Sequence, residues 1–221
     1  MKGLLALYLA ALAVACTTLG LAIASLVQPR WITTTLPTPS PIDLHLTTAY
    51  GLFELCETTS NSYESIVTCR KFPNRTQDCG RDGGGWGFCD SWISAGYSHQ
   101  LSLVFALTAI LALVLTLFGT ATVGRGFRTE RLRNGWKLFT ALMGLQAACL
   151  ILSTSLVARE FGHDPRFGVG SKLDHAFILA TVAWALNVLV VFSILFVRAT
   201  GKLRIVPEGA GREDGYETIR D

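Results

Sequence analysis

Four long runs without a charged residue constrain this chain more than any other feature. They extend over residues 3–29, 100–124, 138–158 and 176–197. Each is longer than the roughly 18–20 residues that cross about 30 Å of hydrocarbon as a helix. Four buried helices of a soluble protein are the alternative, but only 16% of the residues are charged, against about 25% in soluble domains. The sequence therefore predicts a four-span membrane protein, with spans at about residues 4–27, 100–124, 136–158 and 176–198.

The first apolar run also has features of a cleaved signal peptide. It opens with Met1 and Lys2 and has small residues near Ala24. The apolar core of a signal peptide is usually about 7–15 residues, which is shorter than this run. We therefore favour a retained span, and either alternative exports the segment that follows.

Basic residues gather on one predicted side of the membrane. The loop 124–137 has four arginines and a lysine against one acid, and three more basic residues follow the fourth run. Because positive residues favour the cytoplasmic side, both termini are expected in the cytoplasm. Residues 28–99 and 159–175 then form two outer loops. Membrane lipid is the expected partner, and no nucleic-acid partner is expected, because topology explains the basic loop.

The tail, residues 201–221, is glycine-rich and of mixed charge. Such a composition buries too little apolar surface to fold by itself, so it predicts a disordered cytoplasmic segment.

The first outer loop is expected to contain short strands. β-branched residues 32–35 are typical of a strand, whereas three prolines within residues 37–41 predict an extended, irregular stretch that continues to residue 48. Residues 50–56 and 63–69 each look like a strand that ends in a cysteine, with a polar turn between them. The pattern predicts a β-hairpin.

Four of the six cysteines, Cys56, Cys69, Cys79 and Cys89, lie in this loop. The exterior is oxidising, so disulfides are expected there. Four cysteines allow three pairings, and the sequence does not choose among them. We favour sequential pairing, because each bridge then closes a short local loop.

One glycosylation sequon lies in the same loop, at Asn74 to Thr76. Asn74 is therefore a candidate glycosylation site on the predicted outer side, although such sequons are often unused.

The sequence offers little for catalysis. The four histidines, His45, His99, His163 and His175, stand apart from one another, and the glycine-rich stretch 80–87 lacks the lysine and hydroxyl residue of a phosphate-binding loop. No charged residue is buried in the middle of a span, which argues against ion-coupled transport. We expect a protein that is not an enzyme, without a metal or cofactor.

A few residues inside the spans indicate how the helices pack. Small residues at four-residue spacing, Ala11 and Ala15 and then Gly20 and Ala24, predict close helix packing in the bundle, with dimerisation through that face as the alternative. The polar residues of the third and fourth spans, Gln146 and Asn187, are expected to hydrogen-bond between helices.

A tryptophan after the first span, a GLF-x-x-C motif and a further cysteine before the second span together resemble the claudin-like tetraspan superfamily. The residues concerned are Trp31, Gly51, Leu52, Phe53, Cys56 and Cys69. The superfamily includes claudins, peripheral myelin and epithelial membrane proteins, calcium-channel gamma-type subunits, clarins and lipoma HMGIC fusion-partner-like proteins. Phe53 stands where most members have tryptophan, as it does in clarins and fusion-partner-like proteins. Fungal claudin-like tetraspans show similarly loose motifs.

The resemblance covers about residues 1–200 and implies an all-α transmembrane four-helix bundle with a small extracellular antiparallel β-sheet. It also implies that Trp31, Leu52 and Phe53 hold the sheet against the helix ends, and that a bridge between Cys56 and Cys69 joins two strands. Contact surfaces are expected in the proline-rich segment, the loop 83–92 and the second outer loop.

The function that this resemblance implies is cell–cell contact or membrane organisation at the plasma membrane or a cell junction, through the outer loops. The partner would be a second copy or another membrane protein. An auxiliary subunit that regulates a channel or receptor is the alternative.

Overall fold

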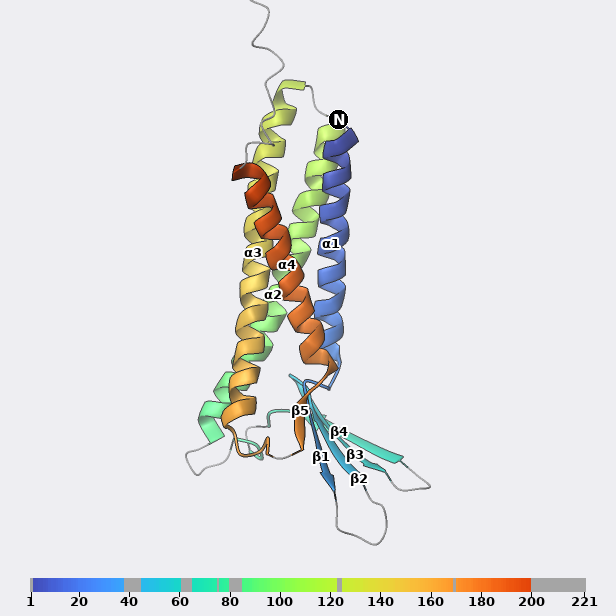
Figure 1. Cartoon of the computed structure of the whole chain (residues 1–221), viewed down its shortest axis with the longest axis vertical. Helices are drawn as coiled ribbons and strands as arrows, with labels where there is room; N and C mark the ends of the chain where they lie inside the picture. The colour runs from blue at the N-terminus through green and yellow to red at the C-terminus, as the bar shows by residue number, and fades with distance from the viewer. Residues whose placement is uncertain are drawn as a thin grey trace, which may run out of the picture.

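The computed structural model describes residues 2–37, 45–60, 65–74, 76–79, 85–122, 125–168 and 170–199 (Figure 1). The predicted disordered tail, residues 201–221, lies outside the described residues. The prolines at positions 39 and 41 also lie outside them.

Four helices lie side by side as a bundle (Figure 1). They are α1 (Lys2–Val27), α2 (Gly85–Thr122), α3 (Arg125–His163) and α4 (His175–Ala199). Each contains a segment long and apolar enough to cross a membrane, and these segments are Tyr8–Val27, Gly87–Phe118, Gly135–His163 and His175–Phe196. The predicted multi-pass membrane protein with four helical spans is therefore supported.

Two helices extend well beyond the predicted spans. Helix α2 begins at Gly85, so the predicted loop 83–92 is wrong from that residue onward. Helix α3 includes nearly all of the predicted loop 124–137 and continues to His163, into the predicted second outer loop. The predicted boundaries followed charge, but a helix satisfies its own backbone hydrogen bonds whether its side chains are charged or apolar. Charged residues therefore indicate where the helix leaves the hydrocarbon, but the helix itself continues beyond them.

A five-stranded antiparallel sheet lies at one end of the bundle, opposite the N-terminus (Figure 1). Its strands are β1 (Ile32–Pro37), β2 (His45–Tyr50), β3 (Glu54–Ser60), β4 (Ser65–Lys71) and β5 (Ser171–Leu173). The spatial order is β4-β3-β2-β1-β5. Strand β5 comes from the segment between α3 and α4, so both predicted outer loops contribute to one sheet.

The strand assignments need two corrections. Residues 45–50 form β2, although the sequence predicted an irregular stretch as far as residue 48, and residues 171–173 form β5 where only an outer loop was predicted. Both strands pair with β1, whose β-branched residues the sequence did identify as strand. Their own sequences show no clear alternation of polar and apolar residues. Each is a strand because it pairs with β1, which precedes β2 directly and is far from β5 along the chain.

The predicted hairpin exists, with its strands shifted along the chain. Strand β3 continues through Cys56 to Ser60, and β4 continues past Cys69 to Lys71. The segment 51–53 bends between β2 and β3 and passes against the bundle. A Cβ on Gly51 would lie 2.8 Å from Cα of Pro29 and 2.9 Å from the carbonyl oxygen of Glu54, so the bend requires glycine.

The small residues of α1 pack as predicted over their first half. Ala11 and Ala15 are buried within the bundle, whereas Gly20 is exposed, and a Cβ added to it would meet no atom within 4 Å. Close packing inside the bundle therefore accounts for the first pair, and the face around Gly20 is open to lipid.

Candidate functional site

The sheet is joined to the bundle by one buried cluster, which we call the junction. Its fully or nearly fully buried members are Trp31, Ile32, Leu52, Leu55, Phe72, Cys79, Phe88, Cys89, Trp92, Ala95, Val157, Phe167, Ala176 and Ala180. They come from the sheet, from the predicted second outer loop and from three of the four helices. This cluster fixes how the sheet stands on the bundle.

Trp31 lies at the centre of the junction between α1 and the sheet. Its side chain is 0% exposed, and its Nε1 donates a 2.7 Å hydrogen bond to the carbonyl of Ser25 in α1. Its ring meets those of His99 and Phe177 edge to face, at centroid distances of 5.5 and 6.2 Å. A large apolar side chain with its polar atom satisfied is a strong anchor, because burial costs it no hydrogen bond.

The bend after β2 places its two apolar residues differently. Leu52 is 1% exposed inside the junction, whereas Phe53 is 36% exposed at its edge. The Phe53 ring lies 3.0 Å from where a Cβ on Gly96 would stand, so it rests on the backbone of α2. Phe53 covers the junction from outside rather than filling its interior.

Two disulfides connect segments at or next to the junction. Cys56 of β3 bonds Cys69 of β4, which lies directly opposite it in the sheet, with their Cα atoms 4.1 Å apart. Cys79 bonds Cys89, which lies in the second turn of α2. The pairing is the sequential one that we favoured. The second bridge ties the segment after β4 to a helix, whereas the sequence predicted that it closes a short local loop.

Aromatic rings fill most of the remaining junction. Trp92 contacts Phe72, Phe88 and Phe167 at centroid distances of 5.5, 5.3 and 6.0 Å. Its Nε1 donates a 3.2 Å hydrogen bond to the carbonyl of Gly51, at the bend after β2. The sequence did not single out these rings. The four-residue spacing of Phe88 and Trp92 would have placed them on one helical face, but only once α2 was known to begin before residue 88.

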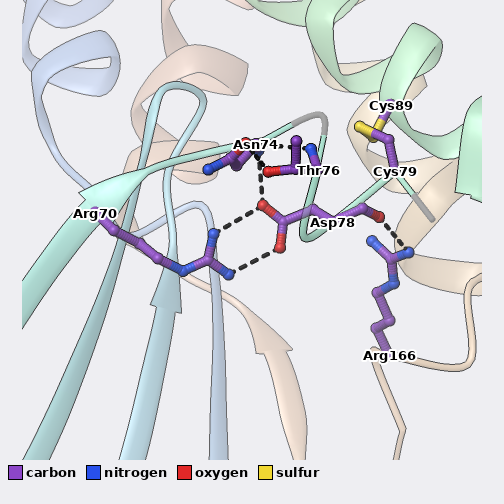
Figure 2. Close-up of polar contacts among 7 residues, drawn as sticks. All are labelled: Arg70, Asn74, Thr76, Asp78, Cys79, Cys89 and Arg166. Atoms are coloured by element: carbon purple, nitrogen blue, oxygen red, sulfur yellow. Dashed lines mark hydrogen bonds and ion pairs between the residues drawn. A yellow bond between two sulfur atoms is a disulfide. The ribbon is translucent and has the colours of Figure 1, made fainter.

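An ionic network secures the exposed side of the junction (Figure 2). Arg70 of β4 donates two hydrogen bonds of 2.8 Å to the carboxylate of Asp78, one to each oxygen. The backbone N–H of Asn74 donates a third, of 2.7 Å, and Arg166 donates a 2.7 Å bond to the Asp78 carbonyl. Arg166 also lies over the ring of Phe88, 4.5 Å from its centroid. Asp78 therefore links β4 to the segment between α3 and α4.

The network keeps Asp78 ionised. Burial tends to raise the pKa of this carboxyl, but the hydrogen bonds from Arg70 and from the backbone of Asn74, together with the charges of both arginines, lower the pKa below its usual value. The sequence did not identify this network, because its members come from separate segments and match no spacing rule.

The candidate glycosylation site lies beside this network. Asn74 is exposed, and its Oδ1 accepts hydrogen bonds from the backbone N–H and the hydroxyl of Thr76. Arg75 lies outside the described residues. Modification of Asn74 stays a prediction.

Strand β4 forms one edge of the sheet and is open to solvent along nearly its whole length. It pairs with β3, and no other described strand pairs with it. Ile66 and Val67, on opposite faces of the strand, are 58% and 60% exposed. An edge strand that exposes two neighbouring apolar side chains is a ready template for another chain.

The hydrogen bonds between helices that were predicted for Gln146 in α3 and Asn187 in α4 are not found. Gln146 and Asn187 are both 0% exposed, but no side-chain nitrogen or oxygen of either has a partner among the described residues. Each lies one helical turn from the buried pair Leu150 and Ala183, so both occupy the same depth of the bundle.

The histidines are dispersed, as predicted. His45 lies in β2, His163 ends α3 and His175 begins α4. His99 is buried in α2, where its Nε2 lies 2.9 Å from the carbonyl of Ala22 and 3.1 Å from the hydroxyl of Ser25. Within the described ranges, no group of three or more His, Cys, Asp or Glu residues is placed to hold a metal ion.

Comparison with known proteins adds no relative: no protein-family model matches the chain, and no curated protein sequence matches it.

Proposed function

We propose that this protein is a claudin-like tetraspan of the plasma membrane, with both termini in the cytoplasm and the sheet outside the cell. It acts without catalysis, in cell–cell contact or membrane organisation, by binding a second copy or another membrane protein. The observation that carries this proposal is the exposed edge strand β4, which presents Ile66 and Val67 at the end of a membrane-embedded bundle.

The attachment of the sheet supports a role in contact. Trp31 and the aromatic rings around Trp92 pack the sheet onto the helices, and Asp78 ties β4 to the segment after α3. The disulfide between Cys56 and Cys69 joins β4 to the rest of the sheet. A surface held in this way loses little conformational freedom on binding, which favours association.

The position of the motif residues supports the family assignment. Trp31 and Leu52 are buried where the sheet meets the helices, and Cys56 is bonded to Cys69 across two neighbouring strands. These are the roles that the resemblance implies for them. Phe53, which stands where most members have tryptophan, is the partly exposed exception.

The contact function can be tested with non-adherent cells that express the protein. Ile66→Lys places a charge on the exposed apolar edge, so cell aggregation should fall markedly at equal surface expression. Gln77→Lys is the matched control, because it adds the same charge at an exposed position of the same region away from β4. Equal aggregation by wild type and Ile66→Lys, or equal loss in both variants, would remove β4 as the contact surface.

Orientation is tested by labelling epitope tags in intact cells. A tag inserted after Asn61, between β3 and β4, should be labelled without permeabilisation, whereas a tag at Glu208 should require it. The reverse pattern would overturn the proposed topology.

The auxiliary-subunit alternative is favoured by one observation in the membrane. Gly20 is exposed on α1 with open space around it, and small residues let another helix approach closely. Purification in mild detergent, followed by mass spectrometry of co-eluting proteins, separates the two functions. A stoichiometric channel or receptor would favour the auxiliary role, and homo-oligomers alone would weaken it.

A further inference from the structure

A groove of about 550 Å³ lies at the sheet end of α1 and α4, apart from the junction and from β4. It is lined by Gln28, Pro29, Arg30, His175, Ile178 and Leu179. The candidate spans of the two helices end at Val27 and begin at His175. The groove therefore lies at the depth where hydrocarbon gives way to lipid headgroups. Its volume is within the range of about 300–1,000 Å³ that is typical of small-molecule sites.

The polar and apolar groups of the groove match the two parts of a phospholipid. Gln28 and Arg30 are exposed and carry nitrogen atoms that can donate to a phosphate, whereas Ile178 and Leu179 supply apolar surface. His175 is exposed too, but its Nε2 lies 3.7 Å from Oδ1 of Asp174 and pairs with that carboxylate when protonated. Arginine binds phosphate well, because its planar guanidinium can donate two parallel hydrogen bonds. No hydrogen bond or ion pair to another described residue engages the guanidinium of Arg30.

The acid that precedes His175 is already engaged. The carboxylate of Asp174 accepts hydrogen bonds from the hydroxyl of Thr33 and the backbone N–H of His175, and it does not line the groove. The hydrogen bonds of Thr33 and His175 hold its pKa below the usual range, although burial opposes them. Asp174 therefore caps α4, and the positive charge of Arg30 remains available to a ligand.

Backbone contacts fix the walls of the groove. The carbonyl of Arg30 accepts a 3.1 Å hydrogen bond from the N–H of Ala176, and the carbonyl of Trp31 accepts a 3.0 Å bond from the N–H of Asp174. Trp31 itself is fully buried next to Arg30. The segment after α1 is thus held against the first turn of α4.

Apolar surface continues from the groove toward the middle of the membrane. Ile178 and Val182 are exposed one turn apart on α4, and Ile23 and Val27 are exposed one turn apart on α1. These two helices contact each other along the bundle. An acyl chain that extends from the groove into the membrane would contact these apolar side chains. A soluble anion would contact only the polar residues of the groove.

We propose that this groove binds one phospholipid of the adjacent leaflet, with its phosphate against Arg30 and an acyl chain against Ile178 and Leu179. The lipid then sits where the first span, the fourth span and the sheet meet. This site is independent of the edge strand β4, so it does not rest on the contact function.

The test uses the full chain purified in detergent, with bound lipid counted by native mass spectrometry. The probes are phosphatidylcholine, a diacylglycerol with the same acyl chains, and soluble glycerophosphocholine. Phosphatidylcholine should occupy one site. Arg30→Gln should weaken this binding about tenfold, as the loss of one charge-assisted hydrogen-bonding group does. Diacylglycerol and glycerophosphocholine, which each lack one half of the lipid, should bind at least about tenfold more weakly.

Arg159→Gln is the matched control. It removes the same charge from an exposed position on α3, at the sheet end of the bundle, and Arg159 does not line the groove. It should leave binding unchanged. Leu179→Trp, which fills the apolar part of the groove, should also weaken binding. Correct folding of each variant is checked by its two disulfides and its thermal unfolding.

A photoactivatable phosphatidylcholine provides a second readout. Cross-links should map to residues 28–30 or 175–179. Equal binding by wild type and Arg30→Gln, equal loss in Arg159→Gln, or cross-links confined to other helices would overturn the proposal. Equal occupancy by glycerophosphocholine would also overturn it, because a headgroup ligand rather than a membrane lipid would then fill the site.

Discussion

The junction and the middle of the bundle are both buried, but they differ in whether their buried polar side chains have hydrogen-bond partners. In the junction, the indole nitrogens of Trp31 and Trp92 each donate to a backbone carbonyl. In the bundle, the side-chain amides of Gln146 and Asn187 have no partner among the described residues.

The difference shows that the contacts which orient the sheet relative to the helices lie in the junction. The junction is held by directional hydrogen bonds, disulfides and large rings, so one substitution there disrupts several contacts. The bundle at the depth of Ala22, Leu150 and Ala183 is held mainly by close packing of small and apolar side chains, with the contact of His99 Nε2 to the Ala22 carbonyl beside it. The amides of Gln146 and Asn187 do not add to this stability, because burying a polar group without a hydrogen-bond partner costs about 1–3 kcal/mol.

The largest expected effect is that of Trp31→Ala. It removes a fully buried ring and its hydrogen bond to Ser25, and should lower the free energy of unfolding by about 3–5 kcal/mol. Phe53→Ala is the matched comparison at the partly exposed edge and should cost much less. Thermal unfolding in detergent measures both. A Phe53→Ala variant as unstable as Trp31→Ala would contradict the division between interior and edge.

Cys56→Ser should have the next largest effect. Loss of a native disulfide from a small extracellular region costs about 2–5 kcal/mol, so we expect Cys56→Ser and Cys69→Ser to be retained in the secretory pathway. Surface biotinylation measures delivery. Cys16→Ser is the control, because Cys16 is not disulfide-bonded. Normal delivery of both Cys56→Ser and Cys69→Ser would show that the bridge is dispensable.

Asp78→Asn should have an intermediate effect of about 1–2 kcal/mol, because it weakens the hydrogen bonds from Arg70 and the Asn74 backbone without leaving a cavity. The folded pKa of Asp78 is lowered, so its contribution is complete above the unfolded pKa of about 4 and is lost as pH falls through the folded pKa.

The difference in unfolding temperature between wild type and Asp78→Asn should therefore shrink as the pH falls below about 4. Asp90→Asn changes an exposed carboxylate on α2 and should show no such trend. A difference that is constant with pH would mean that the ionised carboxylate does not stabilise the fold.

The smallest effect is expected in the bundle. Gln146→Leu replaces an unpaired polar side chain with an apolar one of similar size, and should change the free energy of unfolding by less than about 1 kcal/mol or stabilise the protein. Leu150→Ala, one turn away, should cost about 2–5 kcal/mol because it leaves a cavity. A comparable loss in both variants would indicate that Gln146 does have a bonding partner.

Parts of this site could be read from local sequence, and parts could not. The hairpin of β3 and β4 was predictable, since two strand-like segments, each with a cysteine, flank a polar turn. The Asp78 network was not, because Arg70, Asp78 and Arg166 meet only after the hairpin, α2 and the segment after α3 have taken their places. No spacing between these residues carries that information.

The sequence by itself determined the four membrane-length helices, because a run of about 20 residues without charge has a single stable arrangement in hydrocarbon. It also determined that four of the six cysteines lie together in one segment between the first two spans. Only the tertiary structure decided which strands make up the five-stranded sheet and in what order they lie. Strand β5 pairs with β1, and the hydroxyls of Thr34 and Ser171 meet across a separation of 137 residues. Hydropathy is a local property of the chain, whereas strand pairing depends on which distant segments the helices bring together.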